Sequence, residues 1–319
     1  MMLAWRLLLA PVLLAQAAAL AQPAYDPAAE VGAWAAGFIE AVSEPNIVAA
    51  RCAPAMNAAL ASMRDSASAR AAMVKVRPCG EQIRSAYAGV NAKLDGLHPL
   101  PPEIEAKTGF SSARFIADQR RLAAATTAYV DDLNRFIDAM AAGDRAALPG
   151  LLARVRTGGG SLMDASILML RLQQSASRLA FVRRAMELRI VLAEAAKGLL
   201  VAVPTAAGLP VGNTMRVLAG RARAAVPAAR MAWQEDRVIL TRLSGHETSS
   251  VTRVLAAGGQ LTEDMLSRGD RLATLLDAAG RRPVLPHLEA QRLATELNNL
   301  ELDMLRSGQA FATALQAEG

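Results

Sequence analysis

The three histidines of the chain are the side chains best suited to acid–base catalysis or metal binding, but their spacing assembles no recognisable site. His98, His246 and His287 lie far apart, and none has a second His four residues away, as a helical zinc site requires. No Glu-x-x-His occurs, so the signature of di-iron helical bundles is also missing. His246, Glu247 and His287 form the least implausible acid–base set. We therefore expect no metal ion and no cofactor, and an enzyme built from scattered residues is only a third hypothesis.

A glycine triplet, Gly158–Gly160, is the second candidate for chemistry. It lacks the lysine of a phosphate-binding P-loop, so we interpret it as a flexible link between two helices. Ser161 would then cap the second helix, and the unpaired backbone N–H groups at that helix start could face an anion. Arg154 and Arg156 lie close enough in the sequence to assist.

Cys52 and Cys79 are the two cysteines of the chain. No C-x-x-C motif and no neighbouring histidine accompany them, which argues against a metal site or a catalytic thiol. An even number of cysteines in an exported protein is most simply explained by a structural disulfide. Closing a loop of this length restricts the unfolded chain by about 3.5 kcal/mol in the loop-entropy treatment.

Residues 1–21 have the three-part layout of a secretory signal peptide. One positive charge, Arg6, precedes an uncharged apolar run, and Ala19-Leu20-Ala21 forms an A-x-A cleavage site. The run is shorter than the roughly 20 apolar residues that span a bilayer, and Pro11 interrupts it. The heavy use of Ala and Arg is typical of a GC-rich bacterial genome. We therefore expect cleavage after residue 21 and a periplasmic or secreted protein.

The pattern of apolar residues predicts helices along nearly the whole chain. Spacings of three and four recur, and no run of four or more residues shows the alternation of a half-buried strand. Hydrophobic residues make up 53% of the chain and aromatic residues only 4%, so the core must be built from Ala, Leu, Val and Met. The sequence predicts an all-α fold, an antiparallel helical bundle with long, coiled-coil-like helices.

Prolines, glycines and capping residues predict where the helices begin and end. The first helix would end at Pro45, and the second would close before Pro78. We expect Thr262 to cap a later helix. The helices are divided into an N-terminal region, residues 22–143, which holds the disulfide, and a C-terminal region, residues 144–319. The two regions could also form one continuous bundle.

Positive charge is concentrated in one part of the chain. The formal net charge is +6, and residues 156–230 hold eleven basic side chains against three acidic ones. They enclose an uncharged segment, residues 198–215, which could lie on anionic lipid head groups. We prefer a buried connection whose neighbouring arginines pair with acidic residues of other helices. The residues that would form a surface for an anionic partner are Arg171, Arg178, Arg183, Arg184, Arg189, Arg221 and Arg223.

The long helices without catalytic motifs favour a non-enzymatic function. Our first hypothesis is an exported periplasmic protein with an interaction or structural role, which presents helical surfaces to a protein partner or to a second copy of itself. The second hypothesis is a membrane- or lipid-associated protein that uses the basic apolar region 156–230. We expect no nucleic-acid partner, because the chain has no nucleic-acid-binding motif and the periplasm is a poor place to meet one.

Overall fold

Long helices account for almost all of the described chain. The computed structural model describes residues 27–176, 180–243 and 248–316, so the predicted signal peptide lies outside the described residues. Within these ranges the predicted all-α fold is confirmed, with nine α-helices and no β-strand. The helices are α1 (Pro27–Ser62), α2 (Ser66–Asp95), α3 (Pro102–Thr108), α4 (Ser112–Ala142), α5 (Leu148–Ala176), α6 (Ala180–Val201), α7 (Gly212–Leu243), α8 (Thr248–Gly280) and α9 (His287–Gln316).

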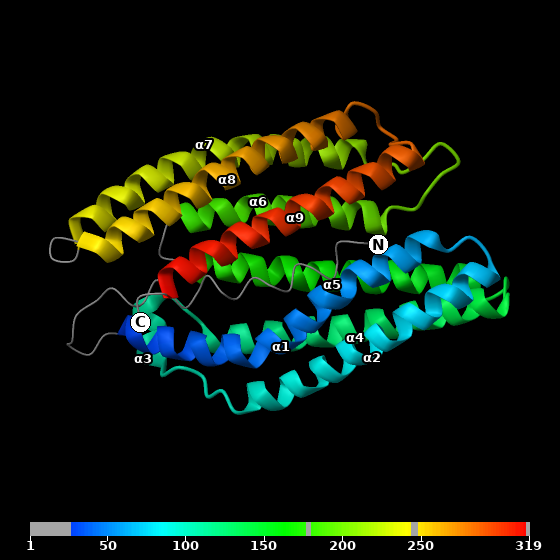
Figure 1. Ribbon diagram of the computed structural model, residues 1–319, viewed down its shortest axis with the longest axis horizontal. Coiled ribbons are helices and arrows are strands. Elements are labelled where there is room, and N and C mark those ends of the chain that lie inside the picture. The colour runs from blue at the N-terminus through cyan, green and yellow to red at the C-terminus, as the bar shows by residue number, and fades with distance from the viewer. Residues whose placement is uncertain (1–26, 177–179, 244–247, 317–319) are drawn as a thin grey trace.

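The long helices lie side by side along the longest axis of the molecule (Figure 1). In chain order α1, α2, α4, α5 and α6 pack in succession, each on the one before. α7 and α8 continue this order, and α9 returns to contact α6 as well as α8. Helices α6 to α9 therefore form a closed four-helix unit, which α5 joins to the N-terminal helices. The predicted boundary at residues 143–144 falls in the connection between α4 and α5 and stays a prediction.

The first two helices are longer than the sequence predicts. α1 continues through Pro45 and Pro54, and α2 continues through Pro78, so the predictions that helices end at Pro45 and before Pro78 are wrong. A proline inside a helix removes one backbone hydrogen bond and disturbs the helix locally. Buried residues on both sides of Pro45, such as Val42 and Ala49, hold α1 in the core and outweigh that loss.

The turn between α1 and α2 is instead set by a capping box at Asp65. The Asp65 carboxylate accepts the backbone N–H of Ser68 at 2.8 Å, and the Ser68 hydroxyl accepts the backbone N–H of Asp65 at 2.9 Å. The bond from the Ser68 backbone holds the pKa of the Asp65 carboxyl below its usual range. The disulfide predicted from the sequence is confirmed: Cys52 of α1 and Cys79 of α2 are bonded, with Cα atoms 5.4 Å apart.

The glycine triplet lies inside a helix, so its interpretation as a link between two helices is wrong. α5 runs without a break from Leu148 to Ala176, and Ser161 is an interior residue that caps nothing. Gly159 is needed because neighbouring helices approach closely. A Cβ atom on Gly159 would lie 2.6 Å from Leu200 Cδ2 of α6 and 3.2 Å from Tyr129 Cε2 of α4. Tight packing therefore overrides the helix-breaking tendency of glycine.

Thr262 is also an interior residue, and the prediction that it caps a helix is wrong. α8 already begins at Thr248, and the Thr262 hydroxyl donates a hydrogen bond to the carbonyl of Gly258 at 2.7 Å. This bond satisfies the buried hydroxyl within its own helix, so a polar residue fits there.

One ion pair lies in the core of the four-helix unit. Arg189 of α6 donates a hydrogen bond to Glu301 of α9 at 2.7 Å, and the two side chains are only 4% and 0% exposed. Taking each charge out of water costs several kcal/mol, which their mutual attraction offsets only while they stay paired. The pair therefore fixes α9 against α6. The sequence predicts that Arg189 faces an anionic partner molecule. In the structure Arg189 is a core residue, because the carboxylate it pairs with, Glu301, belongs to the same chain.

Replacing Gly159 with valine should destabilise the protein, because the added side chain enters the space of Leu200 and Tyr129. We expect Gly159→Val to lower the free energy of unfolding by about 1–3 kcal/mol in urea denaturation. Gly150 is the matched control in the same helix, since a Cβ atom there meets nothing within 4 Å. Gly150→Val should change the free energy of unfolding by less than about 0.5 kcal/mol. Equal effects of the two substitutions would contradict the close approach of the helices.

The buried ion pair predicts a strongly non-additive response to mutation. Arg189→Met alone or Glu301→Leu alone should each lower the free energy of unfolding by about 3–5 kcal/mol, because each leaves a buried charge without its opposite charge. The double variant should recover most of this loss. Urea unfolding of the four proteins measures the coupling, and losses that simply add would show that the two side chains do not act as a pair.

Candidate functional site on the outer face of α7

α7 has one face in the core and the other in solvent, and Figure 1 shows it at one edge of the molecule. Its buried face includes Leu218, Ala222, Val226, Ala229 and Trp233, and it packs against α6 and α8. These residues follow the spacing of three and four that brings side chains to one side of a helix. Burying them fixes the rotation of α7 and so determines which residues face outward.

An uncharged seam runs along the outer face of α7. Its seven exposed residues alternate spacings of three and four, which is the a and d pattern of a coiled-coil helix. Three of them are large and apolar: Val217, Met231 and Val238 are 65%, 59% and 46% exposed. Apolar residues exposed in a row are more informative than scattered ones, since contiguous apolar surface marks interaction sites. The α7 seam consists of Val217, Gly220, Ala224, Pro227, Met231, Gln234 and Val238.

A row of arginines follows one side of the α7 seam. Arg216, Arg223, Arg230 and Arg237 are seven residues apart, which places them on the same side of the helix. Arg216 donates to a carbonyl of α8 at 2.8 Å, and Arg223 pairs with Asp277 of α8 at 2.7 Å. Arg230 and Arg237 form no ion pair within the described part of the chain. The C-terminal half of this arginine row therefore leaves positive charge beside the seam.

A hollow of about 570 Å³ opens beside the middle of the seam. It lies between α7, the C-terminal end of α5 and the first turns of α6. Ala228 and Met231 contribute apolar surface, whereas Arg183, Arg184 and Glu235 contribute charged groups. A depression next to an exposed apolar residue is the geometry in which binding partners insert an anchoring side chain.

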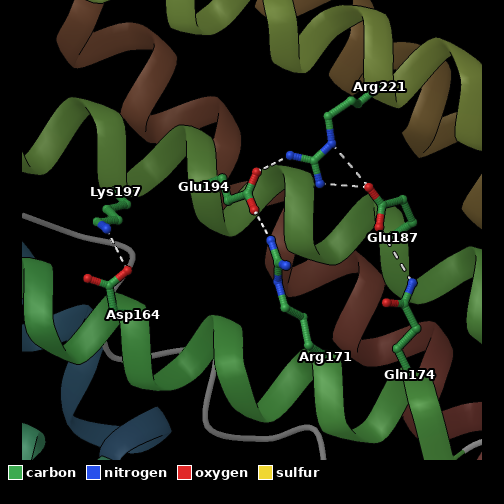
Figure 2. Close-up of polar contacts among 7 residues, drawn as sticks. All are labelled: Asp164, Arg171, Gln174, Glu187, Glu194, Lys197 and Arg221. Carbon is green, nitrogen blue, oxygen red and sulfur yellow. Dashed lines mark hydrogen bonds and ion pairs between the residues drawn. The ribbon is translucent and has the colours of Figure 1, made fainter.

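The other side of the seam carries an arginine whose charge is compensated. Arg221 donates to Glu187 at 2.7 Å and also to Glu194, both on α6, and Arg171 of α5 donates to Glu194 at 2.9 Å (Figure 2). Burial lowers the pKa of Arg221, but the hydrogen bonds and charges of the two glutamates outweigh burial and raise it. Figure 2 also shows that this network connects α5, α6 and α7. The network holds α7 in place and offers little charge to a partner.

The seven arginines predicted to form one surface occupy different environments in the structure. Four of the arginines form ion pairs with carboxylates, and one of these ion pairs is buried. Two other arginines line the hollow. A single continuous basic surface would need all of them exposed and unpaired. Arg183 and Arg184 line the hollow, Arg223 lies in the arginine row, Arg171 and Arg221 belong to the network of Figure 2, Arg189 is in the core, and Arg178 lies outside the described residues.

Sequence reasoning missed two features, the α7 seam and the C-terminal half of the arginine row, which consists of Arg230 and Arg237. α7 carries apolar or small residues on both faces, and the inner stripe alone accounts for a helix in a bundle. The sequence did hold one signal, the spacing of seven residues between Arg216, Arg223, Arg230 and Arg237. A row of like charges beside an uncharged row is typical of a coiled-coil helix that selects its partner by charge.

Of the predicted acid–base set, only His287 lies among the described residues. His287 begins α9, and its partners in the predicted set, His246 and Glu247, lie outside the described residues. No group of three or more His, Cys, Asp or Glu side chains within the described ranges is placed to hold a metal ion.

The uncharged segment, residues 198–215, covers the end of α6, a connection and the start of α7. Most residues of the connection are exposed, with Val203 at 69%, so the prediction of a buried connection is wrong. In the connection Leu209 and Leu285 exchange backbone hydrogen bonds of 2.8 and 2.7 Å, which fasten it to the connection between α8 and α9. Of the helices in the described ranges, none contains an apolar stretch long enough to cross a membrane.

Known proteins offer no guide to the function of this face. A comparison of the chain with protein-family models, with curated proteins and with solved structures finds no match. The function must therefore be inferred from the chemistry of α7 itself.

Arg221 and Arg223 provide a matched test of the network in Figure 2. Arg221→Met should lower the free energy of unfolding by roughly 1–3 kcal/mol, because two half-buried glutamates lose charged hydrogen bonds. Arg223→Met removes an ion pair between exposed side chains and should cost less than about 1 kcal/mol. Thermal or urea unfolding of both variants measures the difference. A larger loss from Arg223→Met would contradict the structural role of Arg221.

Proposed function

We propose that this protein is an exported, non-enzymatic interaction protein that binds a helix of another protein along the α7 seam. The large apolar residues of the seam carry the proposal: Val217, Met231 and Val238. Contact of these side chains with water is unfavourable, and a partner helix would remove it. The coiled-coil spacing of the seam suits a helix as the partner. The hollow next to Met231 offers a place for one anchoring side chain.

Charge complementarity identifies the kind of helix that fits. Arg230 and Arg237 lie beside the seam without an ion pair in the described chain, so the partner should carry Asp or Glu next to its own apolar seam. A second copy of α7 is a poor partner. Antiparallel pairing would set the two arginine rows against each other, and in parallel pairing only Arg230 would meet an acid, Glu235.

Export to an oxidising compartment is supported by the bond between Cys52 and Cys79. Structural disulfides persist in the periplasm and outside the cell, whereas the cytosol keeps thiols reduced. The sequence of residues 1–21 supplies a route to that compartment, since it has the layout of a bacterial signal peptide. The partner should therefore be another exported or membrane-attached protein.

Photo-crosslinking from the seam tests this function. A photoreactive amino acid at Met231 should capture one exported protein in cells, whereas the same group at Val74, an exposed residue of α2, should not. Arg230→Glu combined with Arg237→Glu should abolish the capture. The charge-matched control, Arg51→Glu combined with Arg292→Glu, should leave it unchanged, because neither control residue lies on α7.

The identity of the captured peptide decides the outcome. A crosslinked peptide with an apolar spacing of three and four and acidic flanks supports the proposal. Equal capture from Met231 and Val74, or capture of a second copy of this chain, would overturn it. So would binding of the purified protein to anionic phosphatidylglycerol vesicles through the same arginines, since lipid would then be the partner.

A further inference from the structure

A second cavity, of about 310 Å³, lies at the end of the molecule where α6 and α9 meet α5. Its volume is at the lower end of the range of small-molecule sites, which are mostly apolar with a few polar groups. Most of its lining is apolar, including Leu152, Leu200 and Leu209. This cavity is separate from the hollow beside the α7 seam, with which it shares no lining residue.

Three polar side chains line this otherwise apolar cavity: Arg156, His287 and Gln291. Arg156 is half-buried and forms no ion pair or hydrogen bond within the described part of the chain. Its neighbour two residues earlier, Arg154, instead pairs with Asp132 at 2.8 Å. A guanidinium next to apolar walls is only partly hydrated, so an anion that pairs with it gains a charge-assisted hydrogen bond.

His287, on α9, adds a second donor or acceptor to the cavity lining. Its Nε2 atom lies 3.1 Å from the carbonyl oxygen of Thr205, so Nε2 carries a hydrogen and donates to that carbonyl. Nδ1 has no hydrogen-bond partner within the described residues. His287 is also the first residue of α9, so the positive end of the helix dipole lies at this wall.

We infer that this cavity binds a small amphipathic carboxylate, with its carboxylate on Arg156 and its apolar chain against the leucines. A purely inorganic anion would leave the apolar walls empty, and a neutral apolar molecule would leave Arg156 without an anion. The site was not evident from the sequence, because its lining comes from α5, α6, α9 and the connection before α7. The inference does not depend on the function proposed for α7.

Isothermal titration calorimetry of the full mature protein tests this inference with three probes: octanoate, octan-1-ol and inorganic phosphate. Octanoate should bind, and the other two should bind at least about tenfold more weakly, since each lacks one half of the recognised chemistry. Arg156→Gln should weaken octanoate by about tenfold to a hundredfold. Arg154→Gln, the matched control on the other side of the same helical turn, should leave octanoate binding within about twofold, because Arg154 does not line the cavity.

Ala294→Leu is a second variant, which fills the cavity without changing charge. Ala294 lines the site on α9 and is partly exposed, so the substitution should block octanoate while the protein stays folded by circular dichroism. Failure of octanoate to bind the unaltered protein would overturn the inference. It would also be overturned by phosphate or octan-1-ol binding as tightly as octanoate, or by both variants binding like the unaltered protein.

Discussion

The buried ion pair between Arg189 and Glu301 sets the arrangement of the C-terminal helices. Both charges lie in the core, so α9 is held where Glu301 meets α6. With α9 in place, α6, α7, α8 and α9 close on one another. α7 then has its inner face buried against α6 and α8 and its outer face left in solvent. The exposure of the α7 seam is thus a consequence of burying the opposite face of α7 against α6 and α8.

The fold class and the disulfide could be predicted because their signals are local or simple to count. The three-and-four spacing of apolar residues is present within each helix, and two cysteines allow one pairing. The continuation of α1 through Pro45 and of α5 through Gly158–Gly160 could not be predicted, because packing between helices decides it. Nothing near Gly159 in the sequence shows that Leu200 and Tyr129 will press against it.

The candidate site was only partly accessible to sequence reasoning for a similar reason. Counting charges locates the basic region, but it does not show which arginines are neutralised. Glu194 pairs with two of them and Asp277 with a third, and each of these acids lies on a different helix from its arginines. The arginines beside the seam that form no ion pair within the described chain are Arg230 and Arg237. Arg237 lies outside residues 156–230, the region where the sequence concentrates positive charge. Tertiary pairing therefore decides which part of a basic region is available to a partner.

Solvent access to the α7 seam inside cells tests most directly whether a partner covers it. Single cysteines at Ala224, Met231 and, as a control, Val74 are all at exposed positions and can be labelled with a maleimide. In the purified protein all three should react at similar rates. In the cells that produce it, the two α7 positions should be protected several-fold while the position on α2 reacts as before. Equal labelling of all three positions in cells would show that nothing occupies the seam and would contradict the proposed function.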